Sequence, residues 1–253
     1  MLYRLQRHPI AVKAHFEFSL VLAYAFPREV LQPLLPPGLE LDTYGDLGFL
    51  AIAMVQTRGL RPAFVPRFLA QNFFLSGYRI FVRFRGTNEK TQRGLRILRS
   101  DTNRPLMAFF GNRLTHYNYH LAKVDCTRDA GKLTLDIRSP AGVADLSVIA
   151  HIGQPATELP AGSPFPDFAA ARKFAGPLPY TFDYEPQTHS IIKIKGVRED
   201  WNPMPVRVDV GSVGFFRSPP FNQIAHPQLA NAFYLENVPY RWKRGEREQL
   251  ARD

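Results

Sequence analysis

The chain has 253 residues, with 32 Lys and Arg against 22 Asp and Glu, which gives a formal net charge of +10 when the histidines are neutral. Its composition, 45% hydrophobic and 21% charged, excludes a disordered chain and a membrane-embedded helix bundle, and indicates a globular protein with a full core. The single cysteine, Cys126, excludes an intrachain disulfide and a thiolate-rich metal site, so we expect a cytoplasmic protein without membrane contact.

Alternating apolar and polar residues predict many short strands in the first 152 residues. Pro27 opens a short predicted helix over 28–31, and the two prolines within 59–66 predict a loop. The expected strands cover 15–24, 39–42, 48–56, 73–85, 93–99, 106–110, 117–124, 132–138 and 143–152. Strands spaced in this way are typical of an antiparallel sandwich or barrel.

The last hundred residues contain more proline, and a Pro-rich stretch over 155–186 surrounds one predicted helix at 166–174. Two alternating strands follow at 190–195 and 206–210, then an amphipathic segment at 228–234 and a charged tail over 241–253. There is no βαβ alternation, no internal repeat and no long linker. The sequence therefore predicts one mainly β domain over residues 1–253, a large curled antiparallel sheet with three short helices outside it.

Common catalytic signatures are missing from this sequence. It contains no Gly-rich phosphate loop, no G-x-S-x-G, no H-E-x-x-H, no dinucleotide fingerprint and no pair of cysteines. These absences exclude most kinase, serine hydrolase, zinc enzyme and dinucleotide-binding functions.

The densest polar cluster lies within residues 111–123. An extended conformation places His116, Asn118 and His120 on one face and an aromatic set on the other, namely Thr115, Tyr117, Tyr119 and Leu121. Two imidazoles on one face can act as proton donor and acceptor near neutral pH. A metal site is less favoured, because no carboxylate or third histidine has a matching spacing. The alternative is that these groups are hydrogen-bonded residues at a sheet edge.

Four arginines lie on neighbouring predicted strands: Arg79, Arg83, Arg96 and Arg99. If those strands pair, several guanidinium groups converge on one side of the sheet, where each needs a protein carboxylate or an anionic ligand. The alternative is that they are solvated arginines that alternate with core residues.

Elsewhere, basic residues are scattered along the chain rather than grouped in a block. This distribution favours a solvated basic surface over a nucleic-acid interface.

Several segments together resemble the DUF2071 family, a branch of the acetoacetate decarboxylase-like superfamily. They are 34–39 with Asp42, 48–54, 78–82, 111–113 with 119–120, 176–186 and 201–206. The resemblance implies a curled antiparallel sheet or barrel around a ligand-sized cavity, with helices packed outside.

Acetoacetate decarboxylases act through a lysine that forms a Schiff base, helped by an adjacent lysine. This chain has no Lys-Lys pair, and the resemblance places Tyr119 and His120 near the lost nucleophile. The nearest amine, Lys123, belongs to the opposite face of the predicted strand. We therefore expect no lysine-dependent decarboxylation.

The sequence-based hypothesis is a protein that holds a small anionic organic acid or carbonyl compound in an internal cavity. Its candidate catalytic residues are His120 and His116, as acid and base next to a carbonyl, with Tyr119 beside them. Its candidate substrate-binding residues are Arg79, Arg113 and Asn118. No metal and no cofactor is expected, and a homo-oligomer is compatible with the sequence. The alternative is a non-catalytic basic protein that binds an acidic partner such as nucleic acid.

Overall fold

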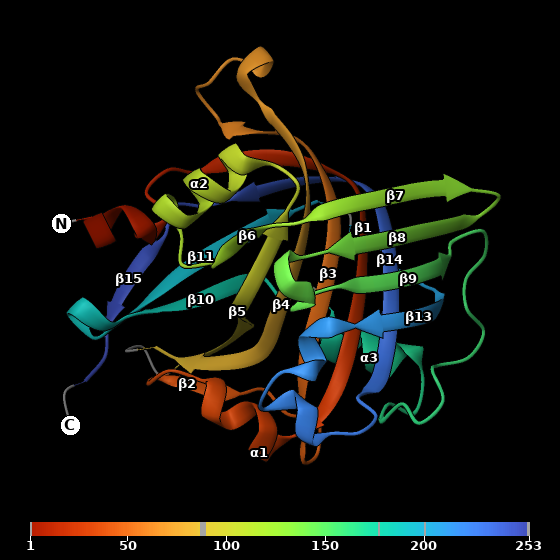
Figure 1. Ribbon diagram of the computed structural model, residues 1–253. Coiled ribbons are helices and arrows are strands. Elements are labelled where there is room, and N and C mark those ends of the chain that lie inside the picture. Colours follow the sequence, from red (N-terminus) through yellow and green to blue (C-terminus); the bar gives the residue numbers. More distant parts are fainter. Residues whose placement is uncertain (1, 87–89, 177, 200, 252–253) are drawn as a thin grey trace.

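Two β-sheets form the molecule, as the computed structural model shows over residues 2–86, 90–176, 178–199 and 201–251 (Figure 1). The larger, curled sheet contains β1 (Val12–Pro27), β2 (Leu39–Leu41), β3 (Leu47–Pro62), β4 (Gln71–Arg85), β5 (Thr91–Thr102), β6 (Tyr119–Leu121), β10 (Tyr180–Glu185), β11 (Ser190–Arg198), β12 (Met204–Pro205), β14 (Gln228–Trp242) and β15 (Glu246–Gln249). The smaller sheet contains β7 (Lys123–Asp129), β8 (Lys132–Arg138), β9 (Leu146–His151) and β13 (Arg207–Val213).

Helices are few and short in the described residues. The α-helices are α1 (Arg28–Leu31), α2 (Pro105–Leu114) and α3 (Phe168–Ala175). Short 3₁₀ helices occur at η1 (Leu2–Arg7), η2 (Gln32–Leu34), η3 (Arg67–Leu69), η4 (Pro140–Gly142), η5 (Pro186–Thr188), η6 (Gly214–Arg217) and η7 (Phe221–Gln223). Not one of these helices has the length and apolar character needed to cross a membrane.

The long strands of the large sheet pair in the antiparallel order β14, β1, β3, β4 and β5. Their register shifts at several points, including between Phe16 and Phe18 on β1 and between Tyr78 and Arg79 on β4. Such bulges bend a strand and increase its twist, which accounts for the strong curl of this sheet.

Beyond β5 the sheet continues through β10 and β11, and the curl brings β11 back to β14. The β11 and β14 strands pair over three residues each, with Gly196 opposite Trp242 and Arg198 opposite Tyr240. The pairings of β5 with β10 and with β6 are parallel. The curled sheet is therefore confirmed, but it is mixed rather than purely antiparallel.

The smaller sheet covers one face of the larger one, and the main core lies between them (Figure 1). Leu20, Leu22 and Ile52 of the large sheet pack in one cluster with Leu135 and Val148 of the small sheet, all of them fully or almost fully buried. Burial of each such side chain stabilises the fold by about 1.5–3 kcal/mol relative to exposure. This face is the one that carries Tyr78 and Ile80 of β4, whereas Arg79 lies on the opposite face of that strand.

The opposite, inner face of the large sheet is filled at one end and open at the other. Phe165 and the α3 residue Phe174 pack at the filled end against Phe49 and Phe81. Farther along, the inner face carries small residues such as Ala53, which do not fill the curl. The cavity described below occupies this remaining space.

One predicted strand is a helix. Residues 106–110 lie in α2, which begins with Pro105 at its first turn, where proline already has the required φ angle and lacks only an N–H that the helix does not use. Leu106, Phe110 and Leu114 recur every four residues and face one side, toward the cavity. A short apolar run fits a helix and a buried strand equally well, which explains the error.

The ends of several elements also differ from the prediction. β3 continues to Pro62, inside the predicted loop, because it pairs with the start of β1 at Val12. The amphipathic segment 228–234 is part of the long strand β14. In place of a charged tail, residues up to Trp242 belong to β14, and β15 pairs with β11.

Candidate ligand cavity

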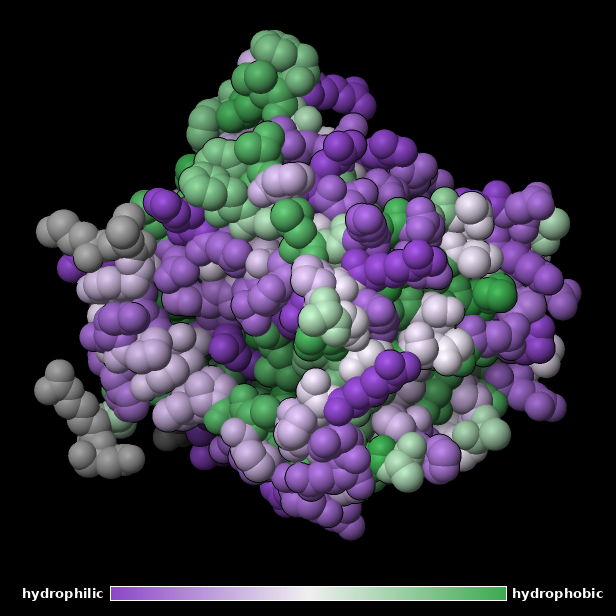
Figure 2. Space-filling model, in the orientation of Figure 1, coloured by the Kyte–Doolittle hydropathy of each residue, from purple (hydrophilic) through white to green (hydrophobic). Residues whose placement is uncertain are grey.

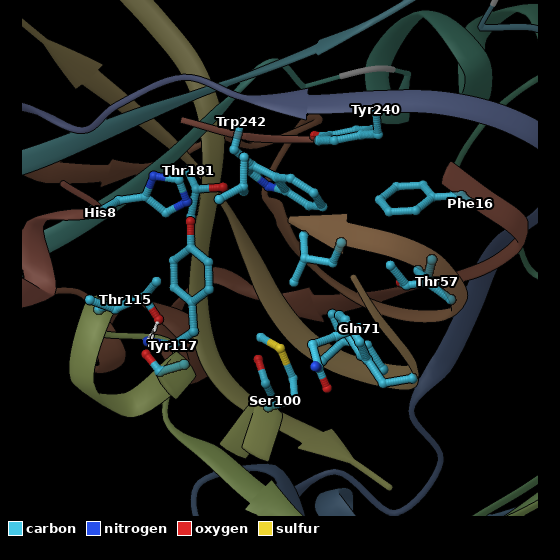
Figure 3. Close-up of a pocket in the computed structure, with 18 of the residues that line it drawn as sticks. His8, Phe16, Thr57, Gln71, Ser100, Thr115, Tyr117, Thr181, Tyr240 and Trp242 are labelled. Atoms are coloured by element: carbon cyan, nitrogen blue, oxygen red, sulfur yellow. Dashed lines mark hydrogen bonds between the residues drawn. The ribbon is translucent and has the colours of Figure 1, made fainter. Parts of the chain in front are cut away.

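A cavity of about 480 Å³ lies inside the curl of the large sheet, beneath α2 (Figure 3). This volume is within the range of small-molecule sites, about 300–1,000 Å³. Most of the lining is apolar and includes Val21, Val55, Leu75, Ile97 and Met107. Its shape therefore suits a small organic molecule with an apolar body.

Apolar side chains also surround the cavity mouth. The loop between β3 and β4 projects from the body with Phe64 and Phe68 exposed, at 76% and 83% (Figures 1 and 2). Leu69 of this loop and Phe110 of α2 are exposed in part and line the cavity as well. The entrance therefore lies between this loop and α2.

Three aromatic rings form one wall of the cavity (Figure 3). Phe16 stacks on Tyr240 with 4.6 Å between ring centroids, and Trp242 lies 4.4 Å from Tyr240. Their alternate positions on β14 place Tyr240 and Trp242 on the same face of that strand. This wall offers a flat apolar surface to a ligand.

Polar groups gather on another side of the cavity, where His8, Thr181 and the hydroxyl end of Tyr117 point toward one another (Figure 3). Burial lowers the pKa of His8, whose Nδ1 is buried without a hydrogen-bond partner in the described structure. Burial also raises the pKa of Tyr117 and Tyr119 well above the ordinary tyrosine value. At neutral pH the imidazole is therefore neutral, and both phenols keep their protons.

Arg79, on β4, also lines the cavity. Its Nε is buried without a hydrogen-bond partner, and within the described ranges Arg79 forms no ion pair. Burial lowers the pKa of Arg79, and electrostatic interactions with Tyr240, Tyr117 and Tyr119 oppose this shift. Because a guanidinium stays charged even when buried, Arg79 is a cation that lacks a protein counter-charge.

The other three arginines of the predicted group are paired with fully buried carboxylates. Arg83 Nε lies 2.6 Å from Asp42 Oδ1, and Arg99 Nη2 lies 2.7 Å from Asp101 Oδ1. The third ion pair joins Arg96 to Asp183. Each arginine of the group was expected to need either a carboxylate or an anionic ligand, and Arg79 is the member without a carboxylate among the described residues.

Arg198, at the end of β11, brings a second guanidinium to the cavity. It lies 4.1 Å from the centroid of the Trp201 ring, and it donates hydrogen bonds to the carbonyl oxygen of Leu178 at 3.3 Å and the hydroxyl of Tyr240 at 3.5 Å. Burial lowers its pKa, and the positive charge of Arg79 lowers it further. None of these partners is a carboxylate.

Acids and lysines are both missing from the lining, as far as the structure describes it. The charged side chains there are Arg61, Arg79 and Arg198. In the same described ranges, no three His, Cys, Asp or Glu side chains are grouped to hold a metal ion. The chemistry available to a ligand is therefore that of guanidinium, phenol, imidazole and hydroxyl groups.

Of the predicted site residues, Arg79 and Tyr119 line the cavity, and the other four do not. Arg113 is exposed on α2, with its guanidinium 5.1 Å from the centroid of the Phe109 ring. Asn118 is exposed, and its Oδ1 lies 3.0 Å from Nε2 of His120. The prediction that Arg113 and His120 face inward is wrong, because 106–114 is helical and only 119–121 of the following segment is a strand.

The two histidines lie near acidic groups outside the cavity. His120 interacts with the Arg99–Asp101 pair, and His116 interacts with Asp183. Burial lowers the pKa of each. Of the predicted aromatic set, Thr115, Tyr117 and Tyr119 line the cavity, whereas Leu121 is exposed. Aromatic rings lose less favourable hydration free energy than imidazoles when they are buried, which favours this orientation.

Four residues of the cavity were not among the predicted site residues: His8, Tyr240, Trp242 and Arg198. A signal for Arg198 was present, because Ile192, Ile194, Gly196 and Arg198 share one face of an alternating strand. The predicted strand ended at 195 and so left this arginine out. His8 and the β14 rings reach the cavity only through contacts between distant parts of the chain, and no local pattern identifies them.

Stability should fall as the pH is lowered through the range in which histidine ordinarily titrates. His8 has a lowered pKa, so below pH about 6.5 the unfolded chain binds more protons at this position than the folded chain. The His8→Asn variant should reduce the loss of melting temperature between about pH 7.5 and about pH 5.5. Asparagine suits this position because the φ angle of His8 is 52°. An unchanged loss in the variant would show that His8 is not buried in its neutral form.

The comparisons with known proteins agree with this fold. The structure is similar to that of an acetoacetate decarboxylase from Legionella pneumophila subsp. pneumophila str. Philadelphia 1, with a TM-score of 0.65, 12% identity and coverage of 96% of this chain and 88% of that one. It is also similar to an acetoacetate decarboxylase-like enzyme from Sphingomonas wittichii RW1, with a TM-score of 0.60, 13% identity and coverage of 97% of this chain and 96% of that one. A third similar structure is the enduracididine biosynthesis enzyme MppR complexed with pyruvate, with a TM-score of 0.55, 10% identity and coverage of 96% of this chain and 90% of that one. The chain therefore has an acetoacetate decarboxylase-like fold.

The family follows from the sequence itself. The model of the DUF2071 family, described as an uncharacterized conserved protein, matches residues 13–239. The chain belongs to the DUF2071 family, which confirms the resemblance found in the sequence. No curated protein matches the chain.

Proposed function

We propose that this protein binds a small organic acid in the cavity and that the guanidinium of Arg79 holds its carboxylate. The observation that carries the proposal is the unpaired state of Arg79 beside three paired arginines. An uncompensated buried charge costs several kcal/mol, and a carboxylate that accepts two parallel hydrogen bonds from a guanidinium offsets that cost.

The other groups in the lining favour the same class of ligand. Tyr117 and Tyr119 remain protonated at neutral pH, so their hydroxyls can donate hydrogen bonds to anionic oxygens. The rings of Phe16, Tyr240 and Trp242 suit an apolar body. The similarity to MppR complexed with pyruvate supports a carboxylate ligand for a fold of this kind.

Proton transfer next to a carbonyl would fall to groups that line the cavity. His8 is such a group, whereas His116 and His120 lie outside it. The described lining residues include no lysine that could form a Schiff base, and Lys123 is exposed on β7. The proposal therefore assigns binding to Arg79 and leaves imine chemistry out.

Calorimetry with hexanoate and its uncharged analogue hexanamide tests this function. The two molecules have nearly the same size, and only the acid can pair with a guanidinium. We expect hexanoate to bind at least about tenfold more tightly than hexanamide, because a hydrogen bond between charged groups is worth about 1.5–3 kcal/mol. Equal affinities, or no binding of a series of acids from propionate to octanoate, would contradict the proposal.

A second candidate function, binding of an acidic partner, rests on a groove beside the cavity. The structure gathers basic residues there that are scattered in the sequence, and Glu199 is the single acid among its described lining residues. These basic residues are Lys13, Arg58, Arg61, Arg67 and Arg241. Affinity for RNA or DNA that falls steeply with added salt would support this function, and no binding at low salt would exclude it.

A further inference from the structure

The cavity holds more positive charge than one carboxylate can neutralise. Among the described residues, Arg79 has no counter-ion, and the partners of Arg198 are a backbone carbonyl, a phenol and aromatic rings. Carbonyl and π contacts orient a guanidinium without cancelling its charge. A single carboxylate on Arg79 would leave Arg198 as an uncompensated cation.

The two guanidinium groups belong to the same binding space. Both line the cavity, and the side chain of Tyr240 interacts with each of them. The hydroxyl of Tyr240 sits over Gly196, where a Cβ atom would lie only 2.0 Å from it. The glycine therefore allows Tyr240 to lie against the strand that carries Arg198, and this tyrosine reaches toward both arginines.

The described lining of the cavity provides no acid to balance these charges. Among the described residues that line the cavity there is no Asp or Glu, whereas Arg83, Arg96 and Arg99 elsewhere in the sheet each have a buried aspartate. Those three arginines are thus neutralised by carboxylates, whereas the described residues supply none to Arg79 or Arg198. The missing negative charge is best supplied by a ligand.

We infer that the ligand is a dianion, such as a dicarboxylate, with one anionic group on Arg79, the other on Arg198, and an apolar segment between them. This inference rests on the proposed function and narrows the class of acid. The apolar segment packs on the wall formed by Phe16, Tyr240 and Trp242. A monocarboxylate of the same length makes the same apolar contacts but pairs with only one of the two arginines.

The test compares each diacid with its own monomethyl ester, so that length and apolar surface stay nearly constant. The probes are succinate, glutarate, adipate, pimelate and suberate and their monomethyl esters, measured by calorimetry at low salt. We expect at least one diacid to bind about tenfold or more tightly than its ester, since a second charge-assisted pair is gained. That ratio should fall to about one in the Arg198→Met variant.

Two further variants separate this inference from the proposed function. Lys195→Met removes an exposed cation from the same strand and should keep the ratio of the unchanged protein. Arg198→Lys keeps the charge and should retain part of the ratio, which would show that Arg198→Met did not act by disturbing the fold. If every monomethyl ester binds as tightly as its diacid, the inference of a dianionic ligand is wrong, and the proposed function is unaffected. If neither diacids nor esters bind, both are overturned.

Discussion

Replacing Arg79 with methionine is expected to weaken the binding of a small carboxylate about a hundredfold and to raise the melting temperature of the ligand-free protein. Binding weakens because the carboxylate of the ligand loses the Arg79 guanidinium as its charged partner. Stability rises because the substitution removes a buried cation that no carboxylate in the described part of the chain balances. Replacing buried charges with apolar groups of similar volume stabilises proteins by about 1–4 kcal/mol, or several degrees for a chain of this size.

Arg83→Met is the matched control, since Arg83 lies on the same face of the same strand. Arg83 is paired with Asp42, so its loss leaves a buried carboxylate with one partner fewer and should lower the melting temperature. Thermal unfolding and calorimetry on the two variants measure both effects. A fall in melting temperature for Arg79→Met as large as that for Arg83→Met would show that Arg79 has a structural partner and would contradict its role as a ligand-binding residue.

Asp42→Ala is expected to lower the free energy of unfolding by about 3 kcal/mol. Asp42 is fully buried, and its two oxygens lie 2.6 Å from Arg83 Nε and 2.5 Å from Arg93 Nε. Arg83 and Arg93 are register partners on β4 and β5, so removal of the carboxylate leaves two cations side by side. Both are exposed in part and can turn to water, which places the effect at the lower end of the range for buried ion pairs.

The same substitution should also loosen α3, because Arg93 donates a hydrogen bond to the carbonyl oxygen of Phe174 at 2.8 Å. Denaturant unfolding measures the stability, and Glu17→Ala serves as control. Glu17 pairs with Arg58 at the surface, where both side chains are about half exposed, and its loss should change little. Equal losses in the two variants would show that the Asp42 pairs contribute no more than a surface ion pair.

Much of the sheet was predictable because alternation reports directly on burial. On β4, Tyr78, Ile80 and Val82 face the core between the sheets and Arg79 faces the other way, as residues that alternate along a strand must. The same rule separated Tyr117 and Tyr119 from the histidines beside them. Local periodicity separates the side chains on the two faces of a strand. It does not say which face borders a cavity, because that depends on what packs on each side.

The rest of the site depends on distant contacts that a single sequence does not display. Asp42 and Asp183 are far along the chain from the arginines that they neutralise, so the sequence could not show that Arg79 alone of the four lacks a carboxylate. His8 reaches the cavity from the segment that directly follows η1. α2 was taken for a strand because its apolar run is too short for periodicity to decide.

The return of β11 to β14 has a consequence for how the protein folds. The hollow between the strands is bounded by segments from both halves of the chain, since β5 pairs with β10, and β1 pairs with β14 near the other terminus. Closing such long loops costs chain entropy before any contact repays it, so folding should be slow. The ribosome must therefore release the chain as far as β14 before the strands that flank the hollow can meet. Until then, the inner aromatic rings lie open to water, and the nascent chain is vulnerable to aggregation.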